Sequence, residues 1–217
     1  MSQTAIFSIP VDKTNIGREF TKSELKFLLE TLPVHKQGEY SGTVGIGEGH
    51  TNHRSVNLSL FDTFAEELKD ITNFCDSRLE HYMKEIEGID TEKGSVRVTQ
   101  CWLNKTKPQE YHAQHFHANS YLSGVLYIKC LPKDGIVFTN RMYGMFNNIE
   151  FPLKKMTIWN AKNLEYNVKE GDLIIFPSWV MHSVNVNQTT NIERVSLSFD
   201  TFPTGEVGRY DTGRVTL

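Results

Sequence analysis

HFHANSYLSGVLY, residues 115–127, joins a pair of histidines to an apolar, strand-like run. His115 and His117 are two positions apart, so on an extended strand their side chains point to the same face. Their Cα atoms would then lie roughly 6.6 Å apart, from where two imidazoles can converge on one metal ion. The polar run KTKPQEY precedes the pair. The pair therefore lies where a loop enters a strand, which is a common position for a site at the mouth of a barrel.

A third histidine and an Arg-x-Ser motif follow in PSWVMHSV and ERVSLSF. If NQTTN (187–191) is a hairpin loop, His182 pairs with Ser196, and Arg194 lies one pair away on the same face. The step from His182 to Arg194 is then about 7 Å, which is close to the span of a five-carbon diacid. A guanidinium and a hydroxyl can together bind the far carboxylate of such a diacid. The spacing thus predicts an anion site beside a three-histidine metal site.

Arg194 and His112 each have a simpler interpretation. An isolated arginine at position 194 is as often a surface residue that pairs with Glu193 or Glu165. His112 lies on the loop before the histidine pair and is expected at the rim of the site, outside the metal centre.

Composition limits the class of protein. The 217 residues fit one domain, and 39% hydrophobic with 23% charged residues is typical of a soluble globular protein. The net charge of −3 argues against general binding to nucleic acid. The apolar runs are too short to cross a membrane, and the N-terminus does not resemble a signal peptide. Three cysteines without CxxC spacing indicate free thiols, which predicts a cytoplasmic protein.

The first part of the chain has helical patterns. Residues 5–11 predict a short edge strand, 22–32 predict a short helix, and 60–87 predict the longest helix, whose apolar stripe should pack on a sheet. Residues 35–56 carry five glycines. We expect a surface loop there, or alternatively a lid over the site.

The rest of the chain consists of short β-branched and aromatic runs separated by turn signals. The predicted strands are residues 95–104, 121–129, 135–140, 156–160, 164–168, 172–177, 182–186 and 193–202. Helices followed by about eight strands predict a mainly β (α+β) double-sheet jelly roll with N-terminal helices packed on one sheet. A parallel βαβ sheet is disfavoured because no crossover helices are available.

We expect one domain over residues 1–217. Residues 1–94 would supply the N-terminal strand, loop and helix support, residues 95–202 the β core, and residues 203–217 a C-terminal tail.

Taken in order, the motifs H-x-H, SGVLY, GDLIIFPSWVMHSV and ERVSLSFDTF resemble the small iron(II)/2-oxoglutarate-dependent oxygenases, which are distant relatives of the prolyl hydroxylases. The resemblance covers roughly residues 95–202. It implies a cupin-like double-stranded β-helix, an Fe(2+) cofactor, 2-oxoglutarate and O2 as cosubstrates, and a hydroxylase activity. The metal-binding, and thus catalytic, residues that it implies are His115 and His182, and the H-x-H pair adds His117 as the third. The cosubstrate-binding residues that it implies are Arg194, Ser196, Tyr127 and Asn104.

One position departs from the wider superfamily, which has H-x-D where this chain has H-x-H. An imidazole at His117 in place of a carboxylate leaves an iron(II) site one charge more positive. Asp200 is not expected to replace that carboxylate, because it lies six residues, roughly 20 Å, beyond Arg194 along the strand. If His117 turns away, water would fill the third position.

Two other functions are open from the sequence. A cupin-like enzyme could use the same three histidines without 2-oxoglutarate, and a barrel could bind metal or ligand without catalysis. The primary substrate could be a peptide, an amino acid or a small metabolite, and residues 141–156 and 41–50 could rim its pocket. A homodimer is also open.

Overall fold

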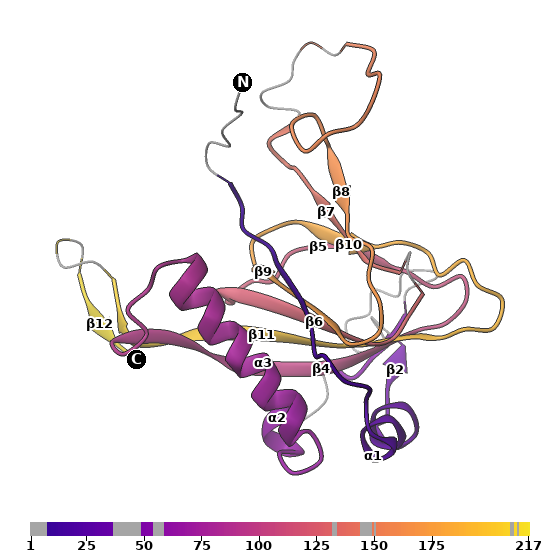
Figure 1. The fold of residues 1–217 in the computed structure, drawn as a ribbon, viewed down its shortest axis with the longest axis horizontal. Coiled ribbons are helices and arrows are strands. Elements are labelled where there is room, and N and C mark those ends of the chain that lie inside the picture. Colours follow the sequence, from indigo (N-terminus) through magenta and orange to yellow (C-terminus); the bar gives the residue numbers. More distant parts are fainter. Residues whose placement is uncertain are drawn as a thin grey trace.

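The computed structural model describes residues 8–36, 49–53, 59–131, 134–143, 149, 151–208, 211 and 213–217. Two antiparallel sheets make up its core, and helices cover the larger sheet (Figure 1). The predicted mainly β, double-sheet architecture is confirmed, and the two sheets do not close into a barrel within the described residues. Most of the predicted loop at 35–56, and residues 144–148 and 150 of the predicted rim, lie outside the described part.

The larger sheet has eight strands. In spatial order they are β1 (Asp12–Asn15), β9 (Asp172–Pro177), β6 (Leu122–Lys129), β11 (Arg194–Val207), β4 (Gly94–Thr106), β3 (His50–Thr51) and β2 (His35–Lys36), with β12 (Val215–Thr216) paired to β11. The smaller sheet has four strands. Their order is β5 (His112–His115), β10 (His182–Val184), β7 (Ile136–Thr139) and β8 (Asn163–Glu165).

Two predicted strands differ from the structure. Residues 8–11 precede β1 and are not in a strand, and residues 157–160 include a turn, closed by the Asn160 N–H donating to the Thr157 carbonyl at 3.2 Å. Asn160 also accepts from the Thr157 N–H through its side chain at 2.7 Å. This local bond competes with strand pairing.

The predicted hairpin between β10 and β11 is wrong, because the two strands belong to different sheets. Asn187 explains the difference. Its buried side-chain amide donates to the carbonyls of Thr106, at 2.9 Å, and Ile192, at 2.8 Å. The bond to Thr106 ties residues 187–192 to the end of β4. This segment therefore crosses from the smaller sheet to the larger one instead of closing a hairpin.

The first helix begins with a capping box. Thr21 accepts from the Glu24 N–H, and the Glu24 carboxylate accepts from the Thr21 N–H. Helix α1 (Lys22–Lys26) continues into the π-helix η1 (Phe27–Thr31). Together the two elements match the helix predicted over residues 22–32.

The predicted long helix is divided into α2 (Leu60–Thr63), α3 (Lys69–His81) and the π-helix η2 (Tyr82–Ile86). Phe64 interrupts it by leaving the helical conformation (φ −124°, ψ 49°). Its ring packs edge-on against Phe27 at 5.0 Å between centroids, which links α2 to η1. None of the described helices is long and apolar enough to cross a membrane.

The larger sheet buries a core on each of its faces. The cluster under the helices includes Leu28, Ile71, Cys75, Leu103, Leu126, Ile175, Leu197 and Phe199. The cluster between the sheets consists of Tyr127, Ile136, Phe138, Val168, Ile174, Phe176 and Val180. Successive strand residues face opposite sides, so β11 packs its apolar residues under the helices and turns Arg194, Ser196 and Asp200 toward the smaller sheet.

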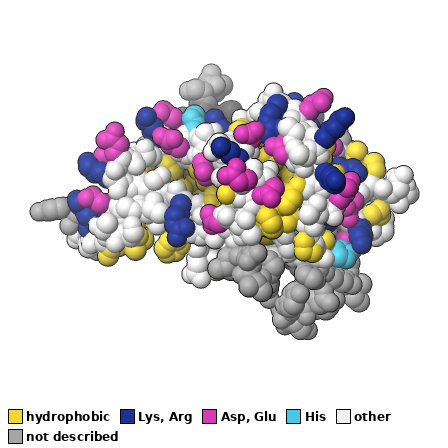
Figure 2. Space-filling model, turned by 90° about the horizontal axis from the view of Figure 1, so that it is seen from below, with side chains coloured by type: hydrophobic (Ala, Val, Ile, Leu, Met, Phe, Trp, Pro, Cys, Tyr) yellow, Lys and Arg dark blue, Asp and Glu magenta, His cyan; other side chains and the backbone are white. Residues whose placement is uncertain are grey.

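Gly124 in the SGVLY motif is required by this packing. A Cβ at position 124 would collide with the Phe199 ring, which lies directly over the β6 backbone. The three cysteines are free, and Cys75 and Cys101 are buried in the core. Acidic and basic side chains are interspersed over the face shown in Figure 2.

Candidate metal centre and cosubstrate pocket

The three predicted metal-binding histidines converge at one end of the smaller sheet. His115 ends β5, and His182, which begins β10, is its register partner. His117 follows two residues after β5. The ring centroids of His115 and His182 are 4.3 Å apart, and His117 lies 5.1 Å and 5.0 Å from them. One nitrogen from each ring lies within 4.8 Å of the others, a spacing that fits a single metal ion.

Each histidine uses its Nδ1 atom for a protein acceptor. His115 donates to the carbonyl of Ala113 at 2.7 Å, and His182 donates to the carbonyl of Val180 at 2.9 Å. His117 instead contacts the Asp200 carboxylate, with 2.6 Å between Nδ1 and Oδ1. A proton on Nδ1 leaves the Nε2 lone pair free in each ring, which is the tautomer that a metal ligand requires.

The surroundings keep two of these imidazoles neutral. Burial, reinforced by nearby His115, lowers the pKa of His182 to about 3. Burial also lowers the pKa of His115, against the opposing effect of its bond to Ala113. Phe176 covers His182 at 4.9 Å between ring centroids, so the apolar cluster between the sheets borders the centre. Neutral imidazoles are available to bind metal without first losing a proton.

The predicted cosubstrate residues lie side by side on the inner face of the larger sheet. Ser196 on β11 is the register partner of both Asn104 on β4 and Tyr127 on β6. Asn104 donates through its side-chain amide to the Ser198 hydroxyl at 2.9 Å. Arg194 is two positions before Ser196 on the same face. Thus all four residues share a face, although the hairpin that predicted a common face for His182, Arg194 and Ser196 does not exist.

Arg194 is buried, with 3% of its surface exposed. Its guanidinium contacts the Asp134 carboxylate at 3.3 Å and donates to the Asn185 carbonyl at 3.2 Å. Burial lowers the pKa of Arg194, and Asp134 opposes that shift. The alternative of a surface arginine paired with Glu193 or Glu165 is therefore wrong.

The Tyr127 hydroxyl is buried and has no hydrogen-bond partner among the described residues. Burial raises the pKa of Tyr127, and the charge of Arg194 opposes that shift. An unpaired buried hydroxyl costs about 1–3 kcal/mol. A carboxylate between Tyr127 and Arg194 would satisfy both groups, so these residues fit the cosubstrate that the sequence predicts.

Two other residues differ from their predicted positions. His112 is buried rather than at the rim, and its Nε2 atom lies 2.9 Å from the Thr106 hydroxyl oxygen. Burial, reinforced by the charge of Arg194, lowers the His112 pKa to about 3. Asp200 was expected to lie far from the metal position, yet it contacts His117. The alternation along β11 could have indicated this, because Asp200 shares a face with Arg194 and Ser196.

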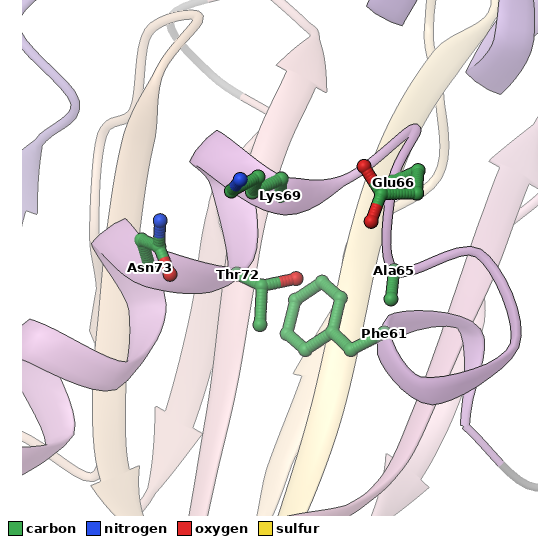
Figure 3. Close-up of a pocket in the computed structure, with 6 residues that line it drawn as sticks. All are labelled: Phe61, Ala65, Glu66, Lys69, Thr72 and Asn73. Carbon is green, nitrogen blue, oxygen red and sulfur yellow. The ribbon is translucent and has the colours of Figure 1, made fainter.

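A separate hollow lies where α2 meets α3 and contains none of the candidate site residues (Figure 3). It is lined by Phe61, Ala65, Glu66, Lys69, Thr72 and Asn73.

Comparison with known proteins decides between the possible families. Residues 100–200 match the model of the family described as "Putative 2OG-Fe(II) oxygenase". Over these residues the chain is similar to the 2OG-Fe(II) oxygenases. Its three clustered histidines are spaced to hold the metal ion that this family description names. No curated protein matches the chain.

Solved structures of such oxygenases share the fold. The epimerase SnoN in complex with Fe3+, alpha ketoglutarate and nogalamycin RO is 12% identical, with 96% of this chain and 89% of that chain covered and a TM-score of 0.54. A Pseudomonas putida prolyl-4-hydroxylase is 16% identical, with coverage of 89% and 93% and a TM-score of 0.51. A 2OG-Fe(II) oxygenase-family oxidoreductase from Burkholderia pseudomallei is 13% identical, with coverage of 83% and 76% and a TM-score of 0.53. The predicted jelly-roll fold is confirmed by these neighbours.

Proposed function

We propose that this oxygenase hydroxylates a small molecule, with iron(II) held by His115, His117 and His182. The observation that carries the site assignment is the convergence of three imidazoles whose Nδ1 atoms are all engaged by protein acceptors. That arrangement leaves the Nε2 lone pair of each ring available for one shared metal ion. When bound, iron(II) and 2-oxoglutarate supply an oxidation by O2 in which 2-oxoglutarate is converted to succinate and CO2.

The residues of the larger sheet hold the cosubstrate. The Arg194 guanidinium, the Ser196 hydroxyl and the Tyr127 hydroxyl would bind its C5 carboxylate, and the contact with Asp134 orients the guanidinium. Asn104 is assigned to the other end of the cosubstrate, because its amide oxygen is not used in the bond to Ser198. The aromatic cluster beside His182 excludes water from this pocket.

A small-molecule substrate is the favoured class because SnoN, which has the same fold, was solved with nogalamycin RO. A peptide or an amino acid is the competing class. A panel of all three classes, assayed for the mass increase of one oxygen atom, separates them. A gain confined to peptides would overturn the small-molecule assignment.

The site itself is tested by succinate formation from 2-oxoglutarate. Turnover should require added iron(II) and should fall to background in His182→Ala. His81→Ala, on α3, is the matched control and should retain wild-type turnover. Full iron-dependent turnover by His182→Ala would show that the metal is bound elsewhere.

A further inference from the structure

His117 differs from the other two histidines in what holds its ring. His115 and His182 donate to backbone carbonyls, which carry no net charge, whereas His117 contacts the carboxylate of Asp200. The side chains of His117 and Asp200 are both 11% exposed, so water screens the contact only weakly.

Asp200 is fixed by more than this one contact. The Ser123 hydroxyl, on the neighbouring strand β6, donates to the same Oδ1 atom at 2.6 Å. The carboxylate is thus set in place by the sheet and is not a mobile surface partner.

The same group of serines also holds the backbone of His117. The Ser178 hydroxyl lies 2.8 Å from that of Ser123 and 2.7 Å from that of Ser120. The Ser178 carbonyl accepts from the His117 N–H at 3.0 Å. Ser178 is therefore connected to Asp200 through Ser123 and to the His117 backbone directly. One hydrogen-bond network thus positions both the ring and the backbone of His117.

The position of the charge is the second part of the argument. Three neutral imidazoles leave the charge of a divalent ion uncompensated in the first coordination sphere. A carboxylate that accepts from the far nitrogen of a ligand makes that imidazole a stronger donor and places a negative charge one residue away from the metal. Relatives with H-x-D carry this charge on the ligand itself.

We propose that Asp200 is a positioning residue of the metal centre, which orients His117 and supplies from one residue away the negative charge that H-x-D relatives place on the ligand. This inference rests on the proposed three-histidine site. It explains how the chain can replace an aspartate by His117 and still offer a carboxylate to the centre. A purely structural role for Asp200, as a buried ion pair, is the alternative.

The test measures metal binding without turnover. The full-length apoprotein is titrated with Co(II) by calorimetry, and the ligand-field absorption of bound Co(II) is recorded. Asp200→Asn keeps the size of the side chain and an acceptor oxygen but removes the charge. We expect the Kd for Co(II) to rise by about 10- to 100-fold and the ligand-field bands to shift. Bound iron should also have a higher Fe(III)/Fe(II) potential.

Asp172→Asn is the matched control. Asp172 is a buried carboxylate on the same sheet, with a side chain 4% exposed against 11% for Asp200, and it pairs with Lys13 at 3.1 Å. A purely structural carboxylate affects the melting temperature alone. Asp172→Asn should therefore lower the melting temperature and leave the Kd for Co(II) within about twofold of wild type.

Two further variants keep the outcomes distinct. Ser123→Ala retains the Asp200 charge but loses one bond, and should weaken Co(II) binding in the same direction by a smaller factor; it carries the test if Asp200→Asn does not fold. Wild-type affinity and spectrum in Asp200→Asn, or in Ser123→Ala if only that variant folds, would overturn the role of Asp200. Wild-type Co(II) binding by His182→Ala would instead overturn the proposed metal site.

Discussion

Tyr127 and Ser196 lie directly opposite each other on β6 and β11, and the hydroxyl of Tyr127 is buried without a partner among the described residues. Arg194 lies on the same face of β11, two residues before Ser196, and its guanidinium already contacts Asp134. The proposed anion site is thus preorganised, with the cation positioned and one donor unused. Such preorganisation favours binding because little ordering remains to be done when the ligand arrives.

Tyr127→Phe should change apoprotein stability and cosubstrate binding in opposite directions. Removing an unsatisfied buried hydroxyl should raise the free energy of unfolding of the apoprotein by roughly 1 kcal/mol. Losing a donor to the carboxylate should raise the Kd for 2-oxoglutarate by about fivefold to tenfold. Urea unfolding and calorimetry measure the two effects. A destabilised apoprotein with unchanged affinity would mean that the hydroxyl has another partner.

Arg194→Gln should raise the KM for 2-oxoglutarate by at least about 30-fold, because truncating one member of a buried charge pair costs about 2–5 kcal/mol. The measurement is succinate formation as a function of 2-oxoglutarate concentration. Arg214→Gln, at an exposed pair with Glu206, is the control and should leave KM unchanged. An unchanged KM in Arg194→Gln would favour an enzyme that uses the three histidines without this cosubstrate.

The apoprotein should lose stability as the pH falls from about 6.5 toward 4. The pKa values of His112 and His182 are lowered to about 3 in the folded state, whereas an unfolded histidine titrates near 6.5. Between these values the unfolded state binds protons that the folded state does not, so stability rises with pH through this window and levels off above it. Each group contributes a slope of up to about 1.4 kcal/mol per pH unit.

His112→Asn should remove one of these two contributions. The free energy of unfolding, measured by urea titration at several pH values, should then fall less steeply between pH 6 and 4 than in the wild type. An unchanged slope would show that His112 is protonated as readily in the folded state as in the unfolded state.

Gly124→Ala should destabilise the protein by about 1–3 kcal/mol, because the added methyl group would collide with the Phe199 ring. The free energy of unfolding in urea gives this cost. Adding Phe199→Leu should restore part of the lost stability, since the smaller side chain makes room for the methyl group. If the loss in free energy of unfolding of the double variant exceeds the sum of the losses of the two single variants, the collision is not the cause.

The sequence by itself determined the short-range features of this protein. Spacing of two residues on a strand placed Ser196 on the face of Arg194, and apolar alternation separated the core positions of β11 from its functional ones, because side-chain direction along a strand depends only on local geometry. The ordered motifs were sufficient to indicate the resemblance to the 2OG-Fe(II) oxygenases and to predict the fold. The capping box at Thr21 is local in the same way.

Only the tertiary structure decided which strands are neighbours. The sequence suggested that β10 and β11 pair, but the bonds of Asn187 to Thr106 place them in different sheets. The contacts of Asp134 with Arg194 and of Asp200 with His117 join residues 60 and 83 positions apart. Such contacts depend on how sheets pack across the core, which no local pattern encodes. For the same reason, the acceptor that distinguishes His117 from the other two histidines became visible only in the folded chain.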